Sequence, residues 1–103
     1  MLEDLQLTPG EQQSLAVLVE NARKNPHDLY EPFHFVKLRL GGYTLQAPDG
    51  SIVSQSVSHK DCYKLAAKGL LKQIAVFIPS EHAFSVTDEG FAYYDQHLVT
   101  SGQ

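Results

Sequence analysis

The chain has 103 residues, of which 43% are hydrophobic, and its twelve acidic and eight basic side chains give a formal charge of −4. A chain of this length holds one domain around one core. The acidic balance excludes the uniformly basic surface with which some proteins attract nucleic acid. We therefore expect a single domain over residues 1–103, with frayed ends at 1–6 and 100–103.

The single cysteine, Cys62, excludes an intramolecular disulfide and a zinc site built from several cysteines of this chain. Residues 1–5 are acidic where a signal peptide would be basic. The sequence has no apolar run approaching the roughly 18 residues that span a bilayer. These features predict a cytoplasmic protein without a membrane segment.

The first helix is predicted to begin at a capping box, because Thr8 is followed by Pro9 and, three residues on, by Glu11. It should end near Lys24, before Asn25-Pro26. Glu11 is expected on the polar face of this helix. The apolar face is predicted from residues at spacings of three and four: Leu15, Leu18, Val19 and Ala22.

Residues 33–40 fit two structures. Pro32 can open a short helix that Gly41-Gly42 would close, with Phe33, Val36 and Leu40 on one face. The alternation of apolar and basic residues over 36–40 also fits a half-exposed strand. We favour the helix because Gly-Gly is a good stop signal.

Two hairpins and two more helices are predicted in the remainder. Residues 43–46 and 51–53 flank a Pro-Asp-Gly turn and predict a small hairpin. A second capping box, Ser58 with Asp61, predicts a helix to about Lys68, followed by Gly69 in a left-handed conformation and by buried Leu70 and Leu71. Strands over 72–78 and 83–86 should form a second hairpin, and Thr87 should cap a terminal helix.

This order of elements resembles the winged-helix family of bacterial regulators, mainly over residues 57–98. The residues that carry the resemblance are Val57-Ser58, Leu65, Lys68-Gly69-Leu70-Leu71, Phe84-Ser85-Val86-Thr87 and Glu89-Gly90-Phe91. The resemblance implies an α+β winged-helix fold with three or four helices and a β-hairpin wing, here with an additional small hairpin before the recognition helix. It implies that the helix from Ser58 is that recognition helix, which enters the major groove in DNA-binding members. It also implies a wing tip at residues 79–83, with Ser80, Glu81 and His82.

Four lysines recur every four residues from Lys60 to Lys72 and predict one basic stripe, opposite buried Cys62 and Leu65. The stripe fits contacts to phosphates, with residues at the helix start near base edges. It fits an ordinary solvated face equally well. In the DNA-binding hypothesis the contacting residues are Gln55, Ser56, Ser58, His59, Lys60, Lys64, Lys68 and Lys72.

Phe91, Tyr93 and Tyr94 line the terminal helix. Because Tyr93 and Tyr94 are adjacent, we expect that both rings cannot point fully inward, which leaves one for an interface. The winged-helix resemblance implies that this interface is that of a homodimer, since such proteins often pair through terminal helices.

Catalytic, metal-binding and cofactor motifs are not expected. Cys62 falls on the predicted buried face, and the histidines form no ligand motif. Two functions stay open: a winged-helix regulator of transcription that binds duplex DNA, and a winged-helix module that binds a protein partner. The second would use residues 43–53 or the aromatic terminal helix.

Overall fold

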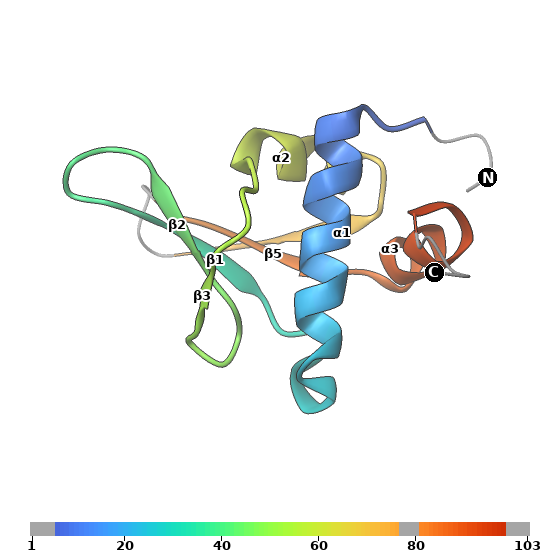
Figure 1. Ribbon diagram of the computed structural model, residues 1–103, viewed down its shortest axis with the longest axis horizontal. Helices are drawn as coiled ribbons and strands as arrows, with labels where there is room; N and C mark the ends of the chain where they lie inside the picture. Colours follow the sequence, from blue (N-terminus) through green and yellow to red (C-terminus); the bar gives the residue numbers. More distant parts are fainter. Residues whose placement is uncertain (1–5, 77–80, 99–103) are drawn as a thin grey trace.

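The computed structural model describes residues 6–76 and 81–98. In this part of the chain, three α-helices accompany a five-stranded antiparallel sheet with strand order β3-β2-β1-β5-β4 (Figure 1). The fold is thus α+β. The elements are α1 (Pro9–Arg23), a 3-10 turn (Pro26–Asp28), β1 (Phe33–Lys37), β2 (Tyr43–Gln46), β3 (Ile52–Val53), α2 (His59–Ala67), β4 (Leu71–Ile74), β5 (His82–Val86), α3 (Asp88–Tyr93) and a π-helical turn (Tyr94–Leu98).

The start of α1 confirms the predicted capping box. The Glu11 amide donates to the Thr8 hydroxyl over 3.2 Å, and the Thr8 amide donates to Glu11 Oε1 over 2.9 Å. Pro9 occupies the first helical turn, where its missing N–H costs nothing. The predicted apolar face is also confirmed, since Leu15, Leu18, Val19 and Ala22 are all buried.

The predicted helix at residues 33–40 is wrong, because Phe33–Lys37 forms β1. Burial alternates along it: Phe33 and Phe35 are buried, while the residues between them are partly exposed. This period of two is that of a strand. Gly41 and Gly42, at φ +103° and +78°, do not end a helix but turn the chain into β2.

Both predicted hairpins are confirmed, and β1 joins them into one sheet. β2 pairs with β3, and β4 pairs with β5, both antiparallel. β1 lies between them, pairing with β2 on one side and with β5 on the other. The predicted strand at 72–78 is shorter in the structure, where β4 ends at Ile74, and residues 77–78 lie outside the described ranges.

The core lies between the helices and one face of the sheet. Helix α1 crosses the sheet near β5, and α2 packs beside the N-terminal half of α1 (Figure 1). The sheet contributes Phe33, Phe35 and Phe84 to this core, and Leu65 of α2 is fully buried within it. Gly69 has the predicted left-handed conformation, at φ +83°, and the predicted burial of the two leucines that follow is confirmed.

The terminal helix begins as predicted, because the Thr87 hydroxyl accepts a hydrogen bond from the Gly90 amide. The expectation that Tyr93 and Tyr94 cannot both point inward is wrong: both are buried, as is Phe91. The helix changes from α to π geometry at Tyr94, which alters the angle between successive side chains. Pairing of two chains through this helix stays a prediction, but it has no exposed ring at Tyr93 or Tyr94 to support it.

The predicted frayed ends fall outside the described residues except for Gln6, whose carbonyl oxygen accepts a hydrogen bond from Lys68 Nζ over 3.1 Å. Within residues 6–76 and 81–98, no helix combines the length and the apolar character needed to cross a membrane.

Candidate functional site

The predicted lysine stripe is divided in the structure. Lys60 and Lys64 are exposed on α2, and Lys72 is exposed on β4. Lys68, at the C-terminal end of α2, instead donates to Glu11 Oε1 over 2.9 Å. Its assignment as a DNA-contacting residue stays a prediction, but a carboxylate of the same chain already holds its ammonium group.

The environment of Glu11 explains why Lys68 is separated from the other lysines of the stripe. The sequence predicted that Glu11 lies on the polar face of the first helix, but its side chain is only 2% exposed and contacts Lys68 at the end of α2. Burial alone would raise the pKa of this carboxyl, but the hydrogen bond from Lys68 and that from the Thr8 amide outweigh burial and bring the pKa below its usual value. Glu11 thus stays ionised and retains Lys68 as its partner.

The predicted capping box at the start of α2 is also wrong. Ser58 is the N-cap residue, but its side chain caps no amide. Asp61 lies against Gly10 of α1 instead, so close that a Cβ at Gly10 would be 2.8 Å from Asp61 Oδ2. Because the Asp61 carboxylate lies at the contact between α1 and α2, it does not form the predicted capping hydrogen bond at the start of α2.

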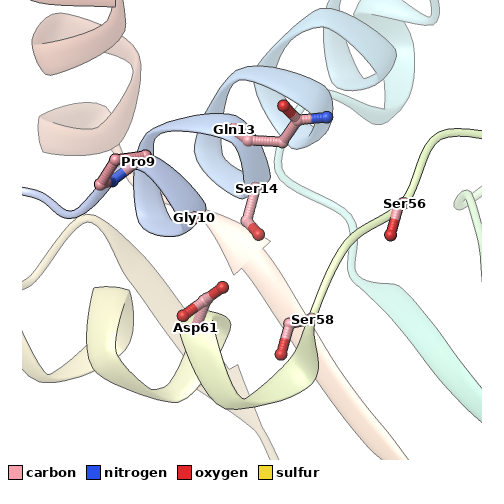
Figure 2. A pocket seen from close by; sticks show the side chains of 7 residues that line it. All are labelled: Pro9, Gly10, Gln13, Ser14, Ser56, Ser58 and Asp61. Atoms are coloured by element: carbon pink, nitrogen blue, oxygen red, sulfur yellow. The ribbon is translucent and has the colours of Figure 1, made fainter.

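A hollow of about 350 Å³ opens where the first turns of α1 and α2 meet (Figure 2). The Asp61 carboxylate and the Ser58 hydroxyl lie at its α2 side. A carboxylate in the wall repels phosphate, so this hollow is not where we place an anion. The residues that line it are Pro9, Gly10, Gln13, Ser14, Ser56, Ser58 and Asp61.

Four rings meet beside the start of α2, and we call them the ring cluster: Tyr43, His59, Tyr63 and His82. The His59 and His82 rings are stacked, with centroids 4.6 Å apart and planes at 12°. Tyr43 leans against both, at 4.7 Å from His59 and 5.4 Å from His82. The Tyr63 hydroxyl and His82 Nδ1 share a hydrogen bond of 2.6 Å.

Buried phenylalanines hold the cluster from below. Phe35 of β1 meets the His59 ring edge-on at 6.0 Å, and Phe84 of β5 meets the Tyr63 ring at 4.9 Å. Burial, followed by the nearby His82 and Lys60, brings the pKa of His59 below its usual value. These surroundings therefore favour the neutral form of His59.

Sequence reasoning missed this cluster, although it named two of the members separately. His59 was assigned to base edges and His82 to the wing tip. The sheet register brings them together, because β1 places Phe35 opposite His82 on one side and Lys37 opposite Tyr43 on the other. Without β1 as the central strand, the sequence has no signal that places β2 and β5 on either side of one strand.

The turn between β1 and β2 is the second notable surface. Leu40 at this turn is 99% exposed and Leu38 is 46% exposed, and basic Lys37 and Arg39 alternate with them. Glu31 and Asp49 are the nearest acids in sequence on either side. We call residues 37–42 the hairpin tip.

Most of the lysines and arginines in the described ranges have no carboxylate partner. The ion pairs within residues 6–76 and 81–98 are Lys68 with Glu11 and Arg23 with Asp95. Two other acids accept hydrogen bonds from tyrosines instead: Glu20 accepts from the Tyr94 hydroxyl, and Asp88 accepts from the Tyr30 hydroxyl. The cations of α2 and the hairpin tip are therefore available to an outside anion.

The remaining predicted site residues have less distinctive positions. Gln55 and Ser56 are exposed on the loop before α2. Glu81 is partly exposed beside His82, which begins β5 rather than forming a turn. Ser80 lies outside the described residues. Within those residues, no group of three histidine, cysteine or acidic side chains is placed to hold a metal ion.

No protein-family model matches the chain, and no curated protein matches it. Functional inference therefore rests on the geometry of the ring cluster, α2 and the hairpin tip.

Proposed function

We propose that the protein binds duplex DNA as a regulator of transcription, with α2 as the recognition helix and the hairpin tip as a second contact. Exposed Lys60 and Lys64 contact phosphates from α2, while Lys37 and Arg39 contact them from the tip. Lys68 takes no part. Arg39 adds a donor that can reach a base edge with two parallel hydrogen bonds, which a lysine cannot do.

One observation supports this proposal above the others: a cation from each of the two elements, Lys37 and Lys60, adjoins the ring cluster. Lys37 lies opposite Tyr43 in the sheet, and the Tyr43 ring is 4.7 Å from the ring of His59, which precedes Lys60 in α2. Within the described ranges, none of these cations has a carboxylate within ion-pair distance. A local basic surface on an acidic protein can still attract a polyanion, because exposed charges beyond about 10 Å are largely screened at 0.1 M salt.

A salt titration of binding to a short duplex tests this proposal. Four phosphate contacts predict a plot of log affinity against log salt with a slope of roughly −3.6. Lys60→Glu should reduce both the affinity and the slope. Lys24→Glu is the matched control, because Lys24 ends α1, is exposed and makes no ion pair within the described residues.

Equal losses in the two variants would show that only net charge matters, and absence of binding at low salt would contradict the proposal outright. A protein partner is then the better candidate. The observation that favours it is the exposure of Leu38 and Leu40 at the hairpin tip, since exposed leucines that lie together mark interaction surfaces. In that case Leu40→Ser, and not Lys60→Glu, should abolish binding to the partner.

A further inference from the structure

The stacked histidines are the least expected feature of the ring cluster. They come from two separate elements, His59 from α2 and His82 from β5, and face each other at 4.6 Å with nearly parallel planes. Within the described residues, Tyr63 is the only hydrogen-bonding partner of either ring, and it occupies Nδ1 of His82. Both nitrogens of His59 and Nε2 of His82 remain without one.

These nitrogens are accessible to an outside group. Within the described ranges, every fully buried side-chain nitrogen or oxygen has a hydrogen-bonding partner. The free nitrogens of the two partly exposed histidines therefore still meet solvent. The free nitrogens are therefore the part of the ring cluster that an outside hydrogen-bonding group would contact.

The charges around the pair are mostly positive. From α2, Lys60 follows His59, and Asp61 on the same helix turns away toward Gly10 of α1. From β1, Lys37 lies opposite Tyr43 of β2, which leans on both histidines. The acid next to the pair is Glu81, which directly precedes β5.

Protonation changes the stack. Two neutral imidazoles stack without penalty, whereas two imidazolium ions at this distance repel each other and the neighbouring lysines. An oxyanion that accepts hydrogen bonds from both rings would remove this repulsion. Phosphate oxygens on a bound nucleic acid are such acceptors.

We infer that His59 and His82 together form an oxyanion site that binds a phosphate group when the pair is protonated, so that nucleic-acid affinity rises as the pH falls. This inference rests on the proposed function for its natural ligand, but the site itself does not. The low pKa of His59 in the free protein agrees with it, because the proton is then taken up as the anion binds. Each proton taken up strengthens binding by about tenfold per pH unit, between the free and bound pKa values.

The test uses the whole chain and follows the histidine ring signals by NMR between pH 5 and 8. Sodium sulfate is the probe, because its charge is constant over this range, and sodium chloride at equal ionic strength is the control. The pKa of His59 should rise in sulfate by roughly half a unit or more. The ring signals of His34, whose side chain lies on the opposite face of β1 from Phe35, should be the same in sulfate and in chloride.

A second measurement compares binding to the short duplex at pH 5.5 and pH 7.5. Affinity should rise about tenfold or more at the lower pH, and His82→Gln should remove most of this rise while His34→Gln leaves it unchanged. Histidine pKa values that are equal in sulfate and chloride would overturn the inference, even if DNA binds. A sulfate-dependent rise without any DNA binding would support the oxyanion site and contradict the proposed function.

Discussion

Replacement of Lys68 by methionine should destabilise the fold without altering DNA binding directly. Lys68 Nζ donates to Glu11 over 2.9 Å, and its side chain is 30% exposed. The Glu11 side chain is almost fully buried, and its other hydrogen bond comes from the Thr8 amide. Methionine preserves the length of the side chain but leaves the carboxylate in the interior without its cation.

The expected cost follows from this geometry. Breaking a fully buried ion pair by removal of one partner costs about 3–5 kcal/mol. Because Lys68 keeps contact with water, which screens the pair, we expect the free energy of unfolding to fall by about 2 kcal/mol. For a domain near 100 residues this lowers Tm by roughly 8–12 °C. The double variant Glu11→Gln with Lys68→Met should lose less than the sum of the single losses, by about 1 kcal/mol.

Urea unfolding at pH 7 measures these differences, with Lys72→Met as the matched control. Lys72 is exposed and makes no ion pair within the described residues, so its replacement should change the free energy by less than about 0.5 kcal/mol. The lowered pKa of Glu11 also predicts a pH dependence. The contribution of the ionised Glu11 carboxylate to the free energy of unfolding is fully present above the ordinary pKa of 4.5. It is lost as the pH falls through the lower pKa that Glu11 has in the folded protein. If Lys68→Met were as mild as Lys72→Met, the ion pair with Glu11 would not be strong, and the reason for leaving Lys68 out of the proposed DNA surface would fail.

Two further predictions concern the terminal helix and the ring cluster. Gly90→Ala should cost about 2–3 kcal/mol in thermal or urea unfolding, because the new methyl group would overlap the carbonyl oxygen of Leu70, and an unchanged Tm would contradict this packing. The pKa of His59 is lowered by burial, then by His82 and Lys60, so its contribution to stability is present above pH 6.5 and lost as the pH falls through the folded-state value. Unfolding in sulfate-free buffer should show the wild type losing more stability than His59→Gln between pH 7 and pH 5, and equal losses would refute the assignment.

Much of the local structure could be predicted from the sequence because its signals are local. Thr8 with Glu11 marked the start of α1, and Thr87 marked the start of α3. The Pro-Asp-Gly turn at residues 48–50 predicted the β2–β3 hairpin, where Ala47 and Ser51 are joined by a backbone hydrogen bond. Each of these signals lies within four residues of the feature that it predicts.

The predictions that were wrong concern features that depend on residues far away in the chain. Residues 33–37 form a strand because β2 and β5 lie on either side of them, which outweighs the stop signal of the two glycines. Glu11 is buried because α2 covers it, and its cation is Lys68, 57 residues later in the chain. The ring cluster requires both of these packing relations, so no single segment of the sequence could reveal it.

The most direct test of the proposed DNA-binding surface is an NMR titration of backbone amide signals with a short DNA duplex. Signals from residues 37–43 and 59–64 should shift together and saturate at one equivalent, with smaller changes in the last helix. Shifts centred on α3, or on the C-terminal half of α1 near Arg23, would place the binding surface elsewhere and contradict the account.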